Sequence, residues 1–317
     1  MQLITAEIPE SPARVTDPVR DPLVVGLVQT RWHADPEEHL SVLSEGIRIA
    51  ADAGASVVFL SELTLSRYPA DTLPHGDATA TAEDLEGGPT YTFAAKAAAD
   101  TGVAVHASLF ERAGGPDGLG YNTAILVAPD GTLLGRTRKL HIPVSAGYYE
   151  DHYFRGGSAD PNPYPVVELP DVRSGQPAAR LGLPTCWDQW FPEVARAYSL
   201  GGAEVLAYPT AIGSEPGHPG FDTQPLWRQV IVGNGIANGT FMVVANRWGD
   251  EGVVNFYGSS FISDPYGRIL VSAPRDADSV LVAPLDLDQR SDWLTLFPFL
   301  ETRRPDTYGV LTRAIGA

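Results

Sequence analysis

The chain of 317 residues contains a single cysteine, Cys186. An internal disulfide is therefore excluded, and a zinc site built on cysteines is disfavoured because such sites need several thiolates. Positive charge is also scarce: 22 Lys and Arg residues stand against 39 Asp and Glu, for a formal net charge of -17. Because such a chain is repelled by nucleic acid and by anionic membrane surfaces, we expect neither as a partner.

Long apolar runs are missing as well. No stretch approaches the roughly 18 consecutive apolar residues of a membrane-spanning helix. The first residues also lack the basic start and apolar core of a secretory signal peptide, so a cytoplasmic location is expected. Apolar residues make up 44% of the chain and charged residues 19%, which is typical of a globular protein that buries a sizeable core.

Short β-branched segments alternate with amphipathic ones, and this alternation predicts an α/β fold. The predicted strands span residues 24–29, 56–62, 103–110, 121–128, 180–185, 205–208, 241–246, 259–262 and 280–285. The predicted helices span residues 36–53, 90–99, 192–200 and 225–238. Asp35 is the expected N-cap of the first helix and Pro36 its first residue, since proline is favoured there.

Two further segments have a distinctive composition. Residues 1–22 are rich in Pro, Arg and Asp, and we interpret them as an N-terminal extension or an oligomer arm. Residues 23–317 contain no linker or break in composition, which predicts one domain. Within it, the Pro- and Gly-rich stretch 142–165 is expected to be a long functional loop.

Three residues of complementary chemistry each lie near the end of an apolar run: Glu62, Lys139 and Cys186. Taken singly, the two charged residues are typical of a solvated surface, and a lone cysteine is typical of a buried core. Together they supply what a thiol nucleophile needs, namely a base for its proton and a cation to stabilise negative charge. This combination predicts a cysteine-dependent catalytic site.

The sequence around each residue sharpens that prediction. Glu62 lies in Phe-Leu-Ser-Glu-Leu, Lys139 in Arg-Lys-Leu-His-Ile-Pro and Cys186 in Cys-Trp-Asp-Gln-Trp-Phe-Pro-Glu. These motifs resemble the Glu-Lys-Cys triad of the nitrilase, or carbon-nitrogen hydrolase, superfamily. The resemblance continues through residues 208–216, 245–247, 256–262 and 303–308, is closest to N-carbamoylputrescine amidases, and covers nearly everything after about residue 23. It implies a four-layer αββα sandwich that assembles as a homo-oligomer of two or more copies.

The resemblance also implies a mechanism without metal or organic cofactor. Cys186 would attack a carbonyl carbon, Glu62 would move the protons, and Lys139 would stabilise the oxyanion together with the backbone N–H of Trp187. Lys139 would also counter the rise in the thiol pKa that a nearby carboxylate causes. A second acid maps to Glu150, where it would position Lys139 or bind substrate, with the adjacent Asp151 as the alternative.

The expected substrate is a small molecule. Trp187, Tyr68 and Tyr149 are the candidates to line its pocket. No arginine occurs at positions 187–190, which disfavours a carboxylate-bearing substrate and favours a neutral or cationic one such as an N-carbamoyl amine. Residues 63–70 depart from the pattern expected of N-carbamoylputrescine amidases, and Arg67 puts a positive charge near the pocket entrance. A simple amide and another N-carbamoyl amine therefore stay as alternative substrates.

Two alternatives belong beside this hypothesis. An aliphatic amidase or a nitrilase would use the same triad on a different substrate. A catalytically silent binding subunit of the superfamily is the non-enzyme alternative, and the intact triad disfavours it. Zinc is not expected, because His141, His152 and His218 show no metal-ligand spacing.

Overall fold

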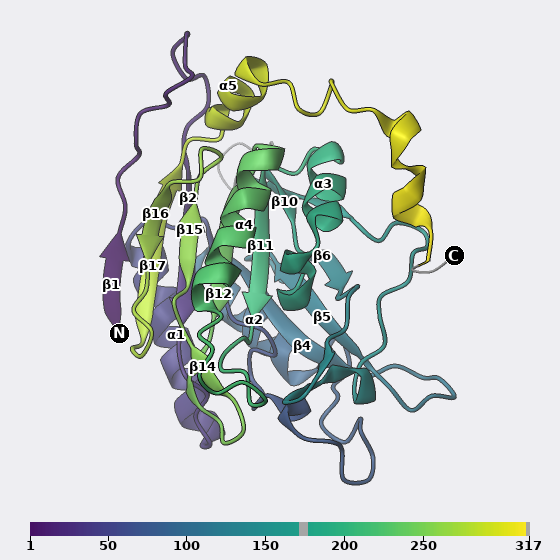
Figure 1. Cartoon of the computed structure of the whole chain (residues 1–317). Helices are drawn as coiled ribbons and strands as arrows, with labels where there is room; N and C mark the ends of the chain where they lie inside the picture. The colour runs from purple at the N-terminus through teal and green to yellow at the C-terminus, as the bar shows by residue number, and fades with distance from the viewer. Residues whose placement is uncertain (171–176, 315–317) are drawn as a thin grey trace.

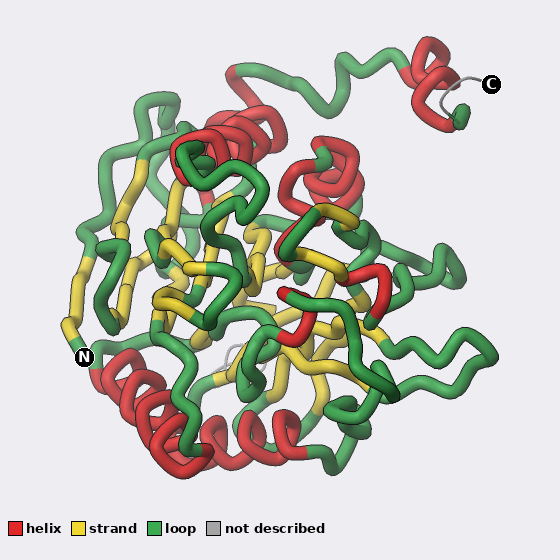
Figure 2. Tube along the Cα trace, turned by 60° about the horizontal axis from the view of Figure 1, so that its bottom comes forward, coloured by secondary structure: helices red, strands yellow, loops and turns green. Residues whose placement is uncertain are grey.

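Two β-sheets face each other at the centre of the protein, and helices cover their outer faces (Figure 1). The computed structural model describes residues 1–170 and 177–314. After the molecule is turned, helices lie at the bottom and at the top of the view, with the strands of the two sheets between them (Figure 2).

The first sheet has seven strands in the order β1-β17-β2-β3-β4-β5-β6. Their bounds are β1 Gln2–Thr5, β17 Ser279–Leu285, β2 Leu23–Gln29, β3 Val57–Phe59, β4 Ala104–Glu111, β5 Tyr121–Val127 and β6 Leu133–Arg138. Strands β2, β3 and β4 run parallel to one another. Strand β5 is antiparallel to β4, and β6 is in turn antiparallel to β5. Helices α1 (Pro36–Asp52) and α2 (Pro89–Thr101) supply the connections between the parallel strands and cover the outer face.

The second sheet has six strands in the order β16-β15-β12-β11-β10-β9. Their bounds are β16 Ile269–Ser272, β15 Phe261–Ser263, β12 Phe241–Asn246, β11 Val205–Thr210, β10 Pro177–Gly182 and β9 Val166–Pro170. Helices α3 (Pro192–Leu200) and α4 (Gln224–Asn238) pack on its outer face through a separate apolar cluster.

The main core lies between the sheets and takes side chains from both. Leu27 and Phe59 from the first sheet join Leu181 and Val243 from the second, and all four are buried. Because side chains alternate along a strand, Val28 points the other way and packs against the helices of the first outer layer. This arrangement of helix, sheet, sheet and helix confirms the predicted αββα sandwich.

The predicted helices are confirmed, with ends that differ from the prediction by two residues or fewer. Asp35 caps α1 as expected, since its side chain accepts a hydrogen bond of 2.9 Å from the backbone N–H of Glu37. Strong capping signals and an apolar stripe at helical spacing explain this agreement.

The strand predictions need three corrections. The strand predicted over 180–185 is β10, which begins and ends three residues earlier, at Pro177 and Gly182. The strand predicted over 56–62 ends at Phe59, so Glu62 lies in the turn beyond β3 rather than on it. The strand predicted over 259–262 begins at Phe261, because Ser259 has a left-handed backbone with φ of 60° that a strand does not accommodate.

The N-terminal segment contributes to the fold. Residues of β1 pair in parallel with β17 and form an edge of the first sheet, so part of the predicted extension 1–22 is tied to the sandwich. The division of the chain at residue 22 stays a prediction.

Short elements gather around one end of the sandwich. The stretch 142–165 contains two short strands, β7 (Val144–Ser145) and β8 (Tyr148–Tyr149), followed by the 3-10 helix η2 (Glu150–His152). The other short elements are η1 Pro69–Asp71, η3 Cys186–Trp190, β13 Trp248–Asp250 and β14 Asn255–Tyr257. Helix α5 (Asp288–Leu296) and η4 (Pro305–Thr312) complete the chain. Among the residues described, none of the helices combines the length and apolarity needed to cross a membrane.

Candidate active site

Glu62 lies in a tight turn after β3, and its side chain is fully buried. The next residue, Leu63, has a left-handed backbone with φ of 48°, a region that residues other than glycine seldom adopt. The turn is held by Arg247, which follows β12. One of its guanidinium nitrogens, Nη2, donates to the carbonyl oxygens of Glu62 at 2.7 Å, Leu63 at 3.0 Å and Ser66 at 3.1 Å. These three hydrogen bonds to carbonyl oxygens fix the position from which the carboxylate projects.

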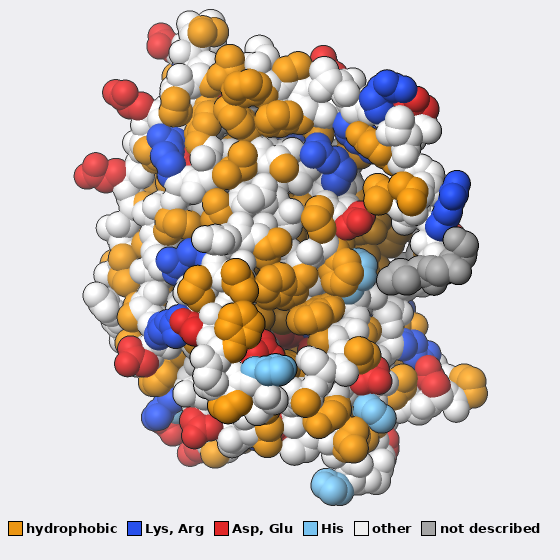
Figure 3. All heavy atoms as spheres, viewed as in Figure 1, with side chains coloured by type: hydrophobic (Ala, Val, Ile, Leu, Met, Phe, Trp, Pro, Cys, Tyr) orange, Lys and Arg blue, Asp and Glu red, His pale blue; other side chains and the backbone are white. Residues whose placement is uncertain are grey.

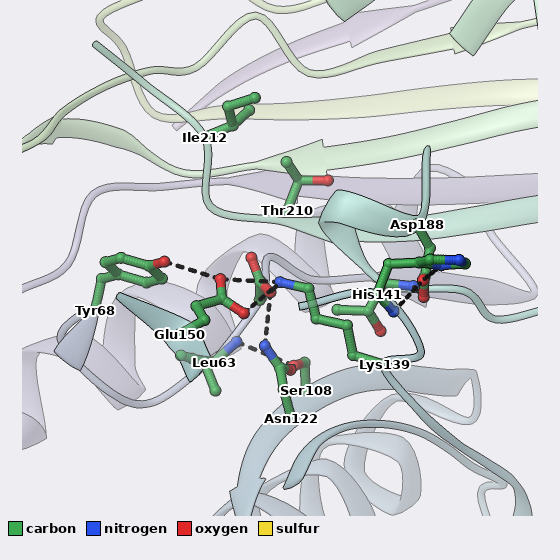
Figure 4. A network of polar contacts seen from close by, with 12 residues as sticks. Leu63, Tyr68, Ser108, Asn122, Lys139, His141, Glu150, Asp188, Thr210 and Ile212 are labelled. Carbon is green, nitrogen blue, oxygen red and sulfur yellow. Dashed lines mark hydrogen bonds and ion pairs between the residues drawn. The ribbon is translucent and has the colours of Figure 1, made fainter. Parts of the chain in front are cut away.

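Lys139 directly follows β6, and its side chain extends into the buried interior (Figure 4). Its backbone N–H donates to the carbonyl oxygen of Asn122 on the neighbouring strand at 2.8 Å. The Lys139 Nζ donates to Glu62 Oε1 at 2.9 Å and to Glu150 Oε1 and Oε2 at 2.9 and 2.7 Å. One buried cation thus bridges two buried carboxylates.

Glu150 reaches Lys139 from the first turn of η2. It is buried, whereas Asp151 is exposed, so the structure places Glu150 rather than Asp151 on Lys139. Tyr68, at the start of η1, donates its hydroxyl hydrogen to Glu150 Oε1 at 2.8 Å (Figure 4). Tyr68 was expected to line the substrate pocket. Because it is fully buried and hydrogen-bonded to Glu150, it is also a candidate to position that carboxylate.

Cys186 is the first residue of η3 and has a left-handed backbone with φ of 40°. Such a strained conformation costs of order 1–3 kcal/mol and often occurs at functional sites. Asp188, two residues later, accepts hydrogen bonds from the backbone N–H of Thr185 at 3.2 Å and of His141 at 3.0 Å. The Asp188 carboxylate therefore ties the turn that carries Cys186 to the segment that carries Lys139.

The charges of the cluster act on the Cys186 thiol. Burial raises the pKa of Cys186 well above its ordinary value, and the negative charge of Glu62 raises it further, while Lys139 offsets part of the rise. The backbone N–H of Ala211, which can hydrogen-bond the thiolate, also lowers it. The three residues predicted from the sequence are thus brought into one electrostatic unit.

The neighbouring groups are perturbed as well. Burial alone would lower the pKa of Lys139, but the charges of Glu150 and Glu62 outweigh it and raise that pKa above its ordinary value. Burial raises the pKa of Glu150 to about 7, with Lys139 opposing the rise and Glu62 adding to it. Lys139 is therefore charged at neutral pH, and the pKa of Glu150 lies close to neutral pH.

Lys139 acts on the thiol in the expected direction, but only in part. Its charge lowers the pKa of Cys186, whereas burial and the charges of Glu62 and Glu150 together raise that pKa by more. The thiol is consequently protonated at neutral pH in the free protein. Such a thiol can act as a nucleophile only after a base removes its proton, and Glu62 is the candidate for that base.

The predicted pocket residues lie in different environments. Trp187 is half-buried beside Trp190, with ring centroids 6.2 Å apart, and Tyr149 is half-buried. Arg67 is not a free charge, since its guanidinium pairs with the buried Asp71. Figure 3 shows hydrophobic side chains gathered around a hollow in this face of the molecule, with acidic side chains inside it.

Three residues that hold the site were not predicted from the sequence, namely Asn122, Asp188 and Arg247. Asn122 donates to Glu62 Oε1 at 2.7 Å from inside β5. A polar amide in an otherwise apolar strand was an available signal, because a buried amide needs a specific partner. Asp188 lies two residues after Cys186, but its contact with residue 141 is not visible in the sequence.

The histidines do not form a metal site in the described part of the chain. Among residues 1–170 and 177–314, no group of three or more His, Cys, Asp or Glu side chains is arranged to hold a metal ion. His141 contacts Asp188 through Nδ1 at 2.7 Å and stacks on Phe191 with ring centroids 3.7 Å apart, so it is a structural link.

Comparison with known proteins decides the family. The family model described as carbon-nitrogen hydrolase matches residues 24–294. The chain belongs to the carbon-nitrogen hydrolase family. It is 36% identical over 304 residues to N-carbamoylputrescine amidase from Arabidopsis thaliana, covering 93% of this chain and 97% of that protein.

Two further relatives extend the comparison of this carbon-nitrogen hydrolase. A citrullinase from Francisella tularensis subsp. tularensis is 33% identical over 295 residues, covering 91% of this chain and 98% of that protein. A crystal structure of a carbon-nitrogen hydrolase from Helicobacter pylori G27 matches with a TM-score of 0.79 and 29% identity, covering 92% of this chain and 98% of that one. The predicted superfamily and the predicted fold are both confirmed.

Proposed function

We propose that this carbon-nitrogen hydrolase cleaves an N-carbamoyl amine with a neutral or cationic tail, using Cys186 as nucleophile. The observation that carries the proposal is the buried cluster of Glu62, Lys139 and Glu150, whose charges act on the Cys186 thiol. The relative named N-carbamoylputrescine amidase supports the substrate class.

In the first half-reaction, Glu62 takes the proton from Cys186 Sγ, and the sulfur electron pair forms a bond to the carbonyl carbon. Negative charge develops on the carbonyl oxygen, where Lys139 Nζ and the backbone N–H of Trp187 stabilise it. Glu62 then gives the proton to the leaving nitrogen as the C–N bond breaks. Ammonia or the amine departs, and a thiocarbamate remains on Cys186.

In the second half-reaction, Glu62 removes a proton from water, and the water oxygen attacks the thiocarbamate carbon. The C–S bond breaks, and Glu62 returns the proton to Cys186 Sγ. The carbamate released decomposes to carbon dioxide and the remaining nitrogen base. Each half-reaction therefore uses the same carboxylate once as base and once as acid.

The surroundings of the thiol favour a cationic tail. Glu215 is half-buried, and its negative charge helps to raise the pKa values of Tyr148 and Tyr257, on which the charge of Cys186 also acts. A carboxylate that shares these two tyrosine neighbours with the nucleophile suits an ammonium group on the substrate. Arg67 and Arg247 are each paired with an acid, so neither offers a free clamp for a substrate carboxylate.

The test combines product analysis with mass spectrometry of the intact protein. N-carbamoylputrescine, citrulline, a linear amide and an aliphatic nitrile are supplied separately, and ammonia and carbon dioxide are measured. Wild type is expected to release both products from N-carbamoylputrescine and to carry a covalent adduct that is absent from Cys186→Ala. Turnover that survives Cys186→Ala would overturn the proposal.

The same panel separates the alternatives. Ammonia without carbon dioxide, from the amide or the nitrile alone, would indicate an aliphatic amidase or a nitrilase. A folded wild-type protein that binds these compounds but gives neither products nor adduct would indicate a silent binding subunit.

We also propose that the protein is a cytoplasmic homo-oligomer of two or more copies. The segment after α5 runs away from the two sheets in both views (Figures 1 and 2) and exposes Val310 and Leu311 by 63% and 62%. Exposed apolar side chains on such a segment favour contact with a second copy. Sedimentation velocity of wild type and of Val310→Asp tests the assembly, and cell fractionation tests the location.

A further inference from the structure

The two carboxylate oxygens of Glu62 differ in the hydrogen bonds that they accept. Oε1 accepts two hydrogen bonds, from Lys139 Nζ at 2.9 Å and from Asn122 Nδ2 at 2.7 Å. Oε2 is buried and has no hydrogen-bond partner within residues 1–170 and 177–314. A buried acceptor without a donor is unfavourable, so an oxygen kept in this state needs a functional explanation.

The orientation of the Asn122 amide is set by a chain of hydrogen bonds. The backbone N–H of Leu63 donates to Ser108 Oγ at 3.1 Å, and Ser108 Oγ donates its own hydrogen to Asn122 Oδ1 at 3.3 Å (Figure 4). The amide oxygen is thereby occupied, and the amide nitrogen points at Glu62. The chain starts and ends on the same turn, since Leu63 follows Glu62 directly.

Asn122 contacts both charged members of the triad. Its side chain donates to Glu62, and its backbone carbonyl accepts from the N–H of Lys139 at 2.8 Å. Because the amide is neutral, it fixes the carboxylate without adding a charge beside the thiol. A second lysine at this position would neutralise the base, whereas an amide leaves it able to accept a proton.

We propose that Asn122 is a positioning residue that commits Glu62 Oε1 to hydrogen bonding and leaves Oε2 to exchange the proton with Cys186. When Cys186 is activated, the S–H bond breaks, an O–H bond forms at Oε2, and the sulfur keeps the electron pair for attack on carbon. This inference rests on the proposed role of Glu62 as the base.

A single hydrogen-bond donor cannot determine which oxygen of Glu62 it binds, because the carboxylate can rotate about its terminal torsion. The terminal torsion of a glutamate side chain is broad and roughly two-fold, so Lys139 alone can bind either oxygen. Two donors from different directions, Lys139 Nζ and Asn122 Nδ2, converge on Oε1 and hold that torsion. Asn122 therefore selects which oxygen faces the reacting groups.

The experiment compares the variants Asn122→Asp and Asn122→Leu with Thr123→Val as the matched control. Thr123 is the next residue of β5 and is equally buried. It donates at 2.6 Å to another carboxylate, Glu111 Oε2, which does not belong to the cluster of Glu62, Lys139 and Glu150. The readouts are thermal unfolding, the pH dependence of kcat/KM, and the pH dependence of Cys186 alkylation by iodoacetamide.

The expected results separate positioning from general loss of structure. Asn122→Asp places two carboxylates in contact, which retain a shared proton to higher pH, so the acid limb of both pH profiles moves up by about one unit or more. Asn122→Leu lowers kcat by about tenfold or more, with KM changed less than about threefold. Thr123→Val lowers thermal stability but leaves both pH profiles at the wild-type position.

Two results would overturn the role of Asn122. One is an acid limb that stays unchanged in Asn122→Asp together with a wild-type kcat in Asn122→Leu. The other is a Thr123→Val profile that moves as far as those of the Asn122 variants. If Asn122→Asp does not fold, the kcat of Asn122→Leu decides alone. Wild type without an adduct would overturn the proposed function as well, whereas a wild-type adduct with unaffected Asn122 variants overturns the positioning role only.

Discussion

Two groups of charged side chains contact the turn that carries Glu62, and they are built in opposite ways. The catalytic cluster has one cation between two carboxylates and consists of Glu62, Lys139 and Glu150. The loop cluster has two cations and two carboxylates and consists of Arg67, Asp71, Arg247 and Glu251. The first carries an excess of negative charge, and the second is balanced.

The two clusters also differ in how their polar atoms are used. In the loop cluster, Arg247 pairs with Glu251 at 2.7 Å and holds carbonyl oxygens of the Glu62 turn, while Glu251 Oε2 accepts from the backbone N–H of Tyr68 at 2.8 Å. Each cluster has a buried polar atom without a partner in the described chain, but in the loop cluster it is a guanidinium nitrogen, Arg247 Nε, which stays protonated, whereas in the catalytic cluster it is a carboxylate oxygen, Glu62 Oε2. Since a buried charge without a match is unfavourable, a balanced cluster suits scaffolding and an unbalanced one suits proton transfer.

The largest effect is expected from removing the single cation of the catalytic cluster. Lys139→Met leaves Glu62 and Glu150 buried side by side, and we expect kcat to fall by about a thousandfold or more because the oxyanion loses a charged donor. Stability should fall by about 3–5 kcal/mol at pH 8, because one partner of a buried pair is missing. The loss should be smaller at pH 5, where a proton relieves the repulsion. Urea unfolding at both pH values measures this.

Arg138→Met is the matched control for that prediction. Arg138 directly precedes Lys139 and pairs with Glu111, but it is partly exposed and outside the catalytic cluster. Its loss should leave kcat near the wild-type value and give a stability change that depends little on pH between 5 and 8. Equal losses of activity in the two variants would contradict the distinction between the catalytic cluster and an ordinary ion pair.

A smaller but still large effect is expected when the balance of the loop cluster is broken. Arg247→Met removes the bonds to three carbonyl oxygens of the Glu62 turn and leaves Glu251 without its partner. Stability should fall by about 3–5 kcal/mol. Because Leu63 no longer has help in keeping its left-handed backbone, kcat should fall by about a hundredfold, since misplacement of about 1 Å has such an effect.

The readout that tests this positioning is the reactivity of the thiol. Iodoacetamide should still alkylate Cys186 in Arg247→Met, because η3 and Asp188 do not depend on the guanidinium. Arg247→Lys should recover part of the stability and less of the kcat, since lysine lacks the planar fork. A fully active Arg247→Met protein would show that the turn holds without the loop cluster.

The same comparison explains which parts of the site could be predicted from the sequence. Glu62, Lys139 and Cys186 carry distinct chemistry inside specific motifs, so their pairing follows from what a thiol nucleophile requires. Arg247 and Asn122 act through contacts 185 and 60 residues distant from Glu62 in the sequence. Such long-range hydrogen bonds depend on how loops meet at the sheet ends, which local patterns do not encode.

The elements of the fold also differed in how well they could be predicted from the sequence. Helix α1 was predictable because its cap, its proline and its apolar stripe agree with one another. Strand β3 was predicted too long, because the apolar segment continues past Phe59 while the backbone turns at Leu63. Local sequence gives no sign of that turn, since leucine does not favour a left-handed conformation. Tertiary contacts impose it, those from Arg247 among them.

A moderate effect is expected from balancing the catalytic cluster. Glu150→Gln removes one of the negative charges that raise the Cys186 pKa, so alkylation of the thiol at pH 8 should become faster. Turnover should nevertheless fall by about tenfold, because Lys139 loses a charge-assisted partner that orients it. A parallel decrease in alkylation and turnover would contradict the view that Glu150 serves position rather than thiol reactivity.

The pH dependence of stability gives Glu150→Gln a second readout. In wild type, the pKa of Glu150 is raised from 4.5 to about 7 on folding. A raised carboxyl pKa contributes stability that is fully present below about pH 4.5 and is lost as pH rises through about 7. The decline between pH 5 and pH 8 should therefore be smaller in Glu150→Gln, by up to about 3 kcal/mol. Guanidinium unfolding of both proteins at the two pH values measures the difference.

The smallest effect is expected when a matched pair of the loop cluster is removed as a whole. The double variant Arg67→Gln with Asp71→Asn deletes a cation and the carboxylate that pairs with it, so no unmatched charge is left behind. Replacing both partners is often nearly neutral, and stability should change by less than about 1 kcal/mol. The KM for N-carbamoylputrescine should change less than about twofold, because Asp71 already cancels the charge of Arg67 near the entrance. A tenfold lower KM in Arg67→Gln alone would instead show that this arginine repels the substrate.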